Sequence, residues 1–176
     1  KAYLLLTMVR EIIRFPHPVL KMPTQKVDVI DKDVQSIVRD MFETMYHAEG
    51  VGLAANQIGI SLSVMVIDTS KKEGSPPLKA VMINPELLEA EGEVKYKEGC
   101  LSFPGLSVEV SRYSKVKVKA LDINGEEKLY LLEGFPAIVF QHEMDHLMGI
   151  TFIDRVNGIK RRLALDKYAK LQKEKV

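Results

Sequence analysis

The chain has 176 residues, of which 46% are hydrophobic and 28% charged, and its formal net charge is +1. This length and composition predict one ordinary soluble globular domain, because 176 residues are too few for two domains of typical size. No apolar run approaches the roughly 20 residues that a membrane-spanning helix needs, and a single cysteine, Cys100, excludes an internal disulfide.

The first predicted element is an amphipathic helix at residues 33–49. Before it, Pro16, Pro18 and Pro23 favour an extended and irregular segment. Apolar residues then recur in alternating steps of three and one: Val34, Ile37, Val38, Met41, Phe42 and Met45. Gly50 stands where a C-terminal helix cap is expected.

Short segments of β type follow the first helix. We expect strands at residues 63–68, 79–84, 93–97, 115–119 and 128–132. Lysine alternates with valine in the fourth of these, which predicts a strand with one wet and one buried face. Asn124-Gly125 is typical of a two-residue hairpin turn before the fifth. With the helices on either side, the pattern predicts the α+β class, with mainly antiparallel β-sheets packed around one central helix.

The central helix is expected at residues 135–148, and it is apolar on nearly every side. A helix of this kind lies in the interior of a protein. It nevertheless carries His142, Glu143, Asp145 and His146. Charged groups in a protein core are costly, so these side chains require partners or a metal ion.

Two of these side chains have the spacing of metal ligands. His142 and His146 are four residues apart, so both imidazoles project from one face of the helix and can converge on one ion. Glu143 flanks such an ion without binding it, where a general base for a metal-bound water belongs. The plainer alternative is a pair of hydrogen-bonded core histidines with a salt-bridged glutamate.

The last predicted element is a helix at residues 158–173. From Asn157 to the end, seven Lys or Arg stand against two Asp or Glu, a local charge of +5 against −4 for the rest of the chain. One interpretation is a solvated amphipathic helix. The other is a basic segment that binds an acidic partner such as RNA.

The third metal ligand has three candidates. Asp154 falls in an expected turn, and Asp166 lies among Lys and Arg on the last helix. Cys100 offers a thiolate, which binds Zn(II) strongly and also suits Fe(II) or Ni(II). A lone cysteine is more often a small buried hydrophobe, but an incomplete site with two histidines favours its role as the ligand.

Three segments together resemble a known family. "GVGLAANQIG" (residues 50–59), "EGCLSFPG" (98–105) and "QHEMDHL" (141–147) closely resemble the three motifs of peptide deformylases, in the same order. The resemblance extends from about Met8 to Arg155. One departure is Asn56, where the family commonly has proline, and we expect it to loosen a turn without removing a reacting group.

The resemblance implies an enzyme and its machinery. Cys100, His142 and His146 are then the ligands of one divalent metal ion, natively Fe(II), with Zn(II), Ni(II) or Co(II) able to replace it. Glu143 is the general base, and the Gln57 amide stabilises the developing oxyanion. The backbone N–H of Leu101 is the second oxyanion donor. The expected reaction is metal-dependent hydrolysis of the formyl group from N-formyl-methionine at the start of new polypeptides, which releases formate.

The resemblance also implies a substrate pocket. Phe135, Ile138 and Val139 share a helix face with His142 and can wall a pocket for a methionine side chain, although each could equally be a plain core residue. The expected substrate-binding residues are Val51, Gly52, Glu98, Gly99, Phe135, Ile138 and Val139.

Further expectations concern an ion pair near the site and the two remaining histidines. Family likeness suggests that Asp145 pairs with Arg112 behind the metal. His17 and His47 are interpreted as ordinary surface or capping residues.

These expectations divide the chain into three parts. Residues 1–7 are set aside as a cloning remnant because Met8-Val9-Arg10 has the form of a natural start. Residues 8–156 are expected to form a single catalytic metallohydrolase domain, and residues 157–176 a basic C-terminal helix. The expected partners are formylated nascent peptides and, through that helix, the ribosome, with no DNA or membrane contact. With no targeting segment before Met8, we expect a cytoplasmic protein.

Two alternatives stay open at this point. One is an HExxH metallopeptidase that cuts internal amide bonds, with Asp166 as its third ligand. The other is a catalytically silent, metal-stabilised module that binds RNA or ribosomes through the basic helix. Glu143 and Gln57 argue against the silent module, because it has no use for either residue.

Overall fold

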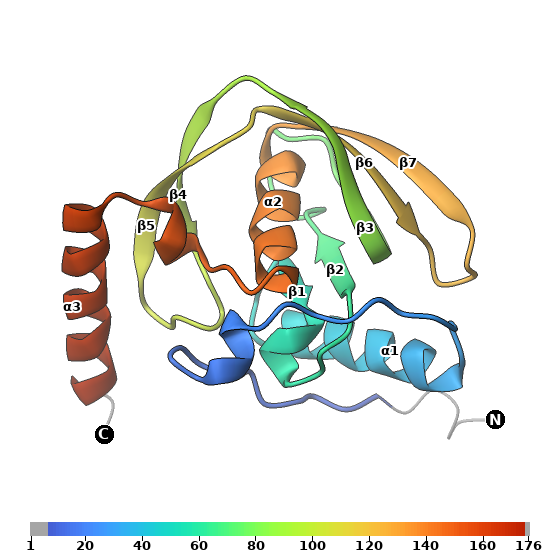
Figure 1. Ribbon diagram of the computed structural model, residues 1–176, viewed down its shortest axis with the longest axis horizontal. Helices are drawn as coiled ribbons and strands as arrows, with labels where there is room; N and C mark the ends of the chain where they lie inside the picture. The colour runs from blue at the N-terminus through green and yellow to red at the C-terminus, as the bar shows by residue number, and fades with distance from the viewer. Residues whose placement is uncertain (1–6, 175–176) are drawn as a thin grey trace.

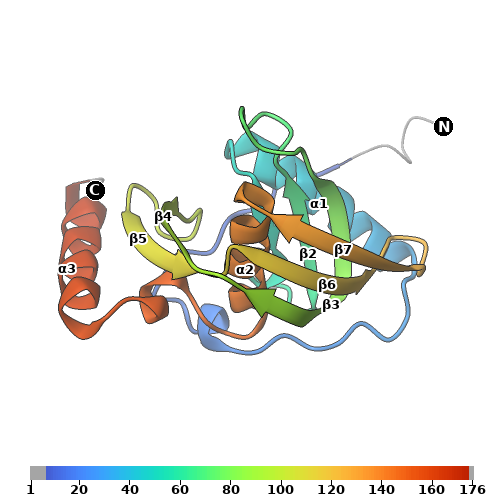
Figure 2. The same cartoon turned by 90° about the horizontal axis from the view of Figure 1, so that it is seen from above.

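The computed structural model describes residues 7–174, so the expected remnant lies outside the described residues except for Thr7. Within that range, no helix combines the length and the apolar character that a membrane span requires. The predicted α+β class is confirmed, because antiparallel strands and three α-helices make up the fold (Figure 1). Helix α2 (Phe135–Leu147) runs through the middle of the molecule, between a five-stranded sheet and a separate two-stranded sheet (Figures 1 and 2).

Helix α1 (Lys32–His47) agrees with the first predicted helix, but it ends differently. The Asp31 side chain caps its beginning by accepting a hydrogen bond from the Val34 N–H at 3.0 Å. The expectation that Gly50 caps the end is wrong, since the cap is Ala48, and Glu49 takes the left-handed conformation with φ 57°. Gly50 serves a close approach instead, because a Cβ there would lie 2.7 Å from Leu101 Cδ1.

The five-stranded sheet is antiparallel throughout, with strand order β1-β2-β3-β6-β7. Its strands are β1 (Gly52–Ala54), β2 (Val64–Asp68), β3 (Lys79–Glu91), β6 (Lys115–Leu121) and β7 (Glu127–Glu133). β1 was not predicted, because three fully buried residues show no alternation of polar and apolar side chains.

Strand β3 continues well beyond the predicted end at residue 84. Asn84 has a positive φ of 51°, and the pairing with β6 changes register between Ile83 and Glu86. The strand therefore bends at this irregularity and continues, where the sequence suggested a stop.

The connection between β6 and β7 differs from the predicted two-residue turn. The strands end their pairing at Leu121 and Glu127, and Gly125 has a positive φ of 80° while Asn124 does not. The Asp122 carboxylate accepts hydrogen bonds from the backbone N–H groups of Asn124 and Glu126, each at 2.9 Å. The loop is therefore longer and is organised by an aspartate side chain.

The second sheet pairs β4 (Val94–Gly99) with β5 (Ser107–Arg112). β4 was predicted at residues 93–97, so the prediction began one residue too early and ended two residues too early. β5 was not predicted. Along β5 the buried positions alternate with exposed ones, and they are Val108, Val110 and Arg112. A charged residue at a buried position hides the apolar alternation that identifies a strand.

Three apolar clusters hold these elements together. One lies between α2 and one face of the five-stranded sheet, and a second lies between α1 and the opposite face, since Met65 and Ile67 belong to the first cluster and Val64 and Val66 to the second.

The third cluster lies under helix α3 (Gly158–Glu174) and includes Phe103 and Phe152. Tyr168 anchors α3 there, with its ring centroid 5.2 Å from that of Phe103 and its hydroxyl donating to the Phe15 carbonyl at 3.0 Å. The rest of α3 stands at the edge of the molecule (Figure 1).

Candidate active site

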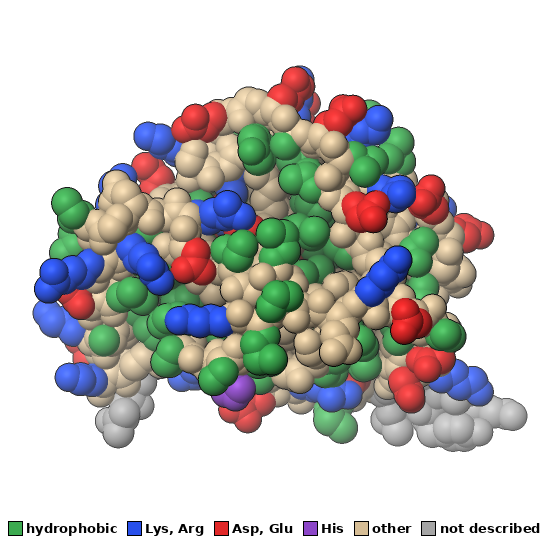
Figure 3. Space-filling view, in the orientation of Figure 1, with side chains coloured by type: hydrophobic (Ala, Val, Ile, Leu, Met, Phe, Trp, Pro, Cys, Tyr) green, Lys and Arg blue, Asp and Glu red, His purple; other side chains and the backbone are tan. Residues whose placement is uncertain are grey.

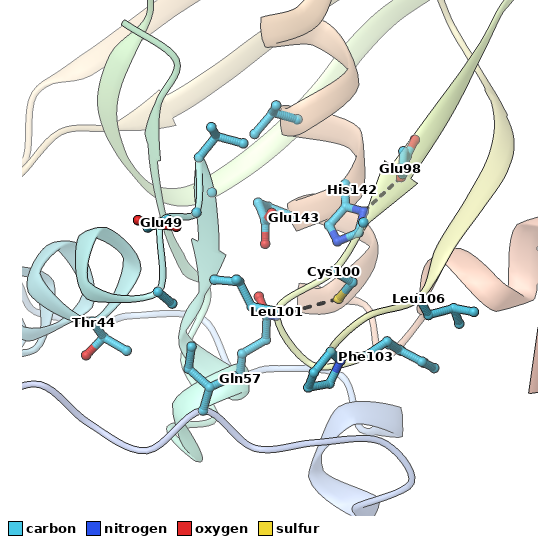
Figure 4. A pocket seen from close by; sticks show the side chains of 18 of the residues that line it. Thr44, Glu49, Gln57, Glu98, Cys100, Leu101, Phe103, Leu106, His142 and Glu143 are labelled. Carbon is cyan, nitrogen blue, oxygen red and sulfur yellow. Dashed lines mark hydrogen bonds and ion pairs between the residues drawn. The ribbon is translucent and has the colours of Figure 1, made fainter. Parts of the chain in front are cut away.

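The three expected ligands meet at one point. His142 and His146 come from the second half of α2, and Cys100 follows the last residue of β4. One side-chain atom from each lies within 4.8 Å of the others, and Cys100 Sγ is 3.4 Å from His146 Nε2. Figure 4 shows Cys100 and His142 side by side at this point. A separation of about 3.5 Å is expected when a thiolate at ~2.3 Å and an imidazole at ~2.0–2.1 Å bind one tetrahedral ion. These donors therefore fit a metal ion.

The two imidazoles stand in different environments. His142 Nδ1 donates to Glu98 Oε1 at 2.8 Å, which leaves Nε2 for an ion. Burial acts to lower the pKa of His142, but the charge and hydrogen bond of Cys100, the hydrogen bond to Glu98 and the charge of Glu143 raise it well above its ordinary value.

His146 is fully buried, and its Nδ1 has no partner within residues 7–174. Burial, with His142 and Arg112 nearby, holds the pKa of His146 well below its ordinary value, so His146 is neutral, the form in which an imidazole binds a metal ion. At His142, whose pKa is raised, a metal ion would have to displace a proton.

A chain of ion pairs begins at Glu98, which accepts the hydrogen bond from His142 Nδ1. Arg112 donates two hydrogen bonds to Glu98, at 2.8 and 2.9 Å, and one to Asp145 at 2.6 Å. The expected pairing of Arg112 with Asp145 is confirmed. Arg155 completes the chain with a 2.7 Å contact to Asp145, which sequence reasoning missed.

The ion-pair chain also fixes the charge of Glu98. Burial acts to raise the pKa of Glu98, yet its hydrogen bonds to Arg112 and His142 hold the pKa below the ordinary value. Glu98 is therefore a carboxylate that accepts from His142. Sequence reasoning placed Glu98 in the substrate pocket and did not anticipate this contact. The contact joins residues 44 positions apart, so no local pattern in the sequence points to it.

Glu143 lies next to the ligands on α2, and its side chain points into the same space (Figure 4). It is 4% exposed, and its Oε1 has no partner among the described residues. Burial raises the pKa of Glu143 to about 7. Strand β1 passes close by, because a Cβ on Gly52 would lie 2.7 Å from Glu143 Oε2 and 2.8 Å from Val139 Cγ1. Only glycine allows the strand to approach this carboxylate so closely.

Gln57 is fixed by hydrogen bonds at both ends of its amide. Its Oε1 accepts from the Ala54 N–H at 3.0 Å, and its Nε2 donates to Ser102 Oγ at 3.1 Å. The same Nε2 is 3.9 Å from Cys100 Sγ (Figure 4). The amide N–H₂ therefore faces the ligand sulfur, next to Leu101 in the following turn.

A cavity of about 870 Å³ opens over these residues. All seven of the expected substrate-binding residues line it: Val51, Gly52, Glu98, Gly99, Phe135, Ile138 and Val139. Tyr96 and the segment at residues 9–14 also line it and were not predicted. These residues reach the cavity through contacts between distant segments, for which the local sequence carries no signal.

The residues outside the cluster limit the alternatives. Asp166 is exposed on α3 and does not belong to the cluster that could hold an ion, so the expected peptidase ligand is wrong. His17 Nδ1 accepts from the Val19 N–H at 3.1 Å, which confirms a capping role, and His47 is exposed at the end of α1.

Comparison with known sequences gives the family directly. The family model described as polypeptide deformylase matches residues 9–162. The peptide deformylase of Aquifex aeolicus (strain VF5) is 68% identical, over 96% of this chain and 99% of its own length. The peptide deformylase of Acidobacterium capsulatum is 45% identical, over 94% of this chain and 97% of its own.

Solved structures agree with the sequences. The crystal structure of a peptide deformylase from Legionella pneumophila matches with a TM-score of 0.88 and 40% identity, over 96% of this chain and 98% of that one. The structure from Ehrlichia chaffeensis matches with a TM-score of 0.90 and 32% identity, over 96% and 99% of the two chains. The chain therefore belongs to the peptide deformylase family, metal-dependent hydrolases that remove the N-formyl group from newly made polypeptides.

Proposed function

We propose that Cys100, His142 and His146 hold one divalent metal ion, natively Fe(II), which Zn(II), Ni(II) or Co(II) can replace in a purified sample. The observation that carries this proposal is the meeting of Cys100 Sγ with two imidazoles from a different element. A thiolate with two imidazoles suits these borderline and soft cations better than Mg(II) or Ca(II). When bound, such an ion supplies a water whose pKa is lowered from 15.7 to about 7.

Glu143 is the proton carrier in this proposal. Its Oε1 has no partner within residues 7–174, and burial raises its pKa to about 7, so the carboxylate can both accept and release a proton near neutral pH. Glu143 takes the proton of the attacking water as the formyl carbon is attacked. It then gives that proton to the departing nitrogen, and formate and a free amine leave.

Gln57 and Leu101 stabilise the oxygen on which negative charge develops. The Ala54 N–H holds Gln57 Oε1, and this contact turns the amide N–H₂ toward Cys100. The backbone N–H of Leu101, in the turn that follows the ligand, is the second donor. Removal of one donor of this kind typically costs about 10²–10³ in rate.

The apolar part of the cavity holds the first side chain of the substrate. Phe135, Ile138 and Val139 line it from the first two turns of α2, next to Val51 of the segment that enters β1. An unbranched methionine side chain adapts well to walls of this kind. Gly52, Glu98 and Gly99 lie along the same cavity, where the two glycines leave room for the peptide backbone. The carboxylate of Glu98 is already bonded, so its side chain acts through His142.

The substrate is N-formyl-methionine at the start of a nascent polypeptide, and we assign the enzyme to the cytoplasm. We assign catalysis to residues 8–156 and contact with the ribosome to residues 157–176. Lys and Arg side chains gather over α3 (Figure 3), and Ile159 and Leu163 of the same helix are 77% and 64% exposed. Such a surface favours an acidic partner such as ribosomal RNA.

Charge reversal on α3 tests the ribosome contact. Lys160→Glu with Lys167→Glu should reduce co-sedimentation with ribosomes and leave turnover of a short peptide unchanged. Lys115→Glu with Lys117→Glu, on the outer face of β6, is the matched control. Unchanged ribosome association in the α3 variant would end this part of the proposal.

Formate release from N-formyl-Met-Ala-Ser tests the catalytic assignment. Glu143→Gln should keep its metal and lose turnover by at least about 10³-fold, because the proton acceptor is gone while the ligands stay. Glu126→Gln, in the exposed β6–β7 loop, is the control for the change of charge. Turnover near the unsubstituted level in Glu143→Gln would refute the role of Glu143.

A further inference from the structure

Two consecutive residues of the turn η3 (Ala55–Ile58) contact the two segments that carry the metal ligands. Asn56 is fully buried, and its Nδ2 donates to the backbone carbonyl of His146 at 2.6 Å. Gln57 points the other way, and its Nε2 donates to Ser102 Oγ at 3.1 Å, beside Cys100 Sγ at 3.9 Å. The turn therefore lies between the end of α2 and the Cys100 segment and is bonded to both.

We propose that Asn56 is a positioning residue, which sets the distance of His146 from Cys100 and from the Gln57 amide. The proposal rests on the ligand roles assigned above. It does not require Asn56 to touch substrate or metal. Asn56 acts through the end of α2, where its amide donates to the His146 carbonyl.

The contact falls where a helix is least constrained. Carbonyl groups in the last turn of a helix lack intrahelical partners and are held by whatever donors lie nearby. The His146 carbonyl accepts from the Gly149 N–H at 3.0 Å, within the same chain reversal, and from Asn56, ninety residues away in sequence. The hydrogen bond from Asn56 therefore links this carbonyl to the turn η3, which also carries Gln57. A buried bond of this kind also escapes competition from bulk water.

The amide of Asn56 is oriented for donation. Its Oδ1 is buried and has no protein partner among residues 7–174, so its fixed interaction with the protein is the bond from Nδ2 to His146. The sequence suggested that Asn56 loosens the turn. The side chain of Asn56 nevertheless links the turn to α2.

The geometry separates an effect on catalysis from an effect on substrate binding. His146 Nε2 lies 3.4 Å from Cys100 Sγ, so a shift of the helix end changes the ligand set directly. Ile138 of the substrate pocket is eight residues earlier on the helix, about 12 Å away along its axis. Loss of the Asn56 bond should therefore lower kcat and metal affinity and leave KM for the peptide nearly unchanged.

The test compares two asparagines that each bridge buried backbone. Asn56→Asp removes the donor without changing shape, and Asn56→Leu removes it without adding charge. Asn84→Asp is the matched control, because Asn84 Nδ2 donates to the Val27 carbonyl at 2.9 Å, away from the metal ligands. Each protein is measured for Zn(II) dissociation constant by competition with a chelator, for kcat and KM on N-formyl-Met-Ala-Ser, and for Tm.

We expect both Asn56 variants to bind Zn(II) about 10-fold more weakly and to lose about 10-fold in kcat, with KM within about twofold. Asn84→Asp should lower Tm and change neither constant. Zn(II) affinity and kcat within twofold of the unsubstituted protein in Asn56→Leu would overturn the proposal, and so would equal losses in Asn84→Asp.

Failure of the ligand assignment gives a different result. If Cys100→Ala keeps the Zn(II) affinity of the unsubstituted protein, the proposed ligand set is wrong. If Cys100→Ala loses zinc while the Asn56 variants keep it, only the role of Asn56 is wrong.

Discussion

Helices α2 and α3 carry their charged residues in opposite ways. In α2, His142, Glu143, Asp145 and His146 are all buried. In α3, six lysines and arginines stand on a helix whose one buried residue is Tyr168. The partners of α2 come from β4, β5 and the turn before α3, whereas α3 has a single exposed ion pair, Arg161 with Asp154 at 3.3 Å, among the described residues.

The contrast is between ionisable groups that are buried in the protein, on α2, and ionisable groups that are solvated by water, on α3. Taking an ionised group out of water costs several kcal/mol unless partners or a metal ion offset it. Every ionisable side chain of α2 must therefore be explained by a contact. Among the described residues, the carboxylate of Glu143 has one buried oxygen without a partner, so it is available for proton transfer. Charge on α3 requires no such explanation, since water already solvates it.

The largest expected effect comes from removing the ligand that α2 does not supply. Cys100→Ala should lose its bound ion and at least about 10³-fold in formate release, because a metal contributes several kcal/mol to reactions of this kind. Metal content by mass spectrometry and turnover are measured on the same sample. Unaltered metal content would remove Cys100 from the site and reopen the question of its third ligand.

The next effect tests the burial of charge behind α2. Arg112→Ala leaves the buried carboxylates of Glu98 and Asp145 without their shared partner. Breaking a buried pair by removal of one member typically costs about 3–5 kcal/mol. Urea denaturation should show this loss. A change below 1 kcal/mol would mean that water reaches these carboxylates, and the contrast with α3 would fail.

Removal of the metal should have a smaller effect on stability. An ion that binds only the folded chain stabilises it by about 2.7 kcal/mol at a concentration 100 times its Kd. Dialysis against a chelator should therefore lower Tm, and added Zn(II) should restore it. Cys100→Ala is the control, because its Tm should not respond to either treatment.

The sequence allowed prediction of α2 better than of its surroundings. An apolar helix with two histidines four residues apart is a local pattern, and it predicted both the helix and two of the residues that cluster with Cys100. Lysine and valine alternate locally in β6, so that strand was also predictable. Local patterns of this kind need no knowledge of the rest of the fold.

The partners of α2 lacked such patterns. β1 is too short to show a period, and β5 has Arg112 at a buried position, so the strand that supplies the key cation was not recognised. The contact of Glu98 with His142 joins residues 44 positions apart, and Asn56 reaches His146 across 90. These contacts depend on the register of β4 with β5 and on the path of one short turn, which one sequence does not encode locally.

The smallest expected effect on stability comes from removing an exposed arginine of α3. Arg161→Ala removes the same kind of guanidinium as Arg112→Ala, but Arg161 and its partner Asp154 are 44% and 36% exposed. Exposed pairs of this kind contribute about 0–1 kcal/mol. Urea denaturation under the conditions used for Arg112→Ala should show a change of that size, which 0.5 M salt reduces further. A loss comparable with that of Arg112→Ala would show that burial does not decide the value of an arginine here, and the burial of charge along α2 would no longer identify the active site.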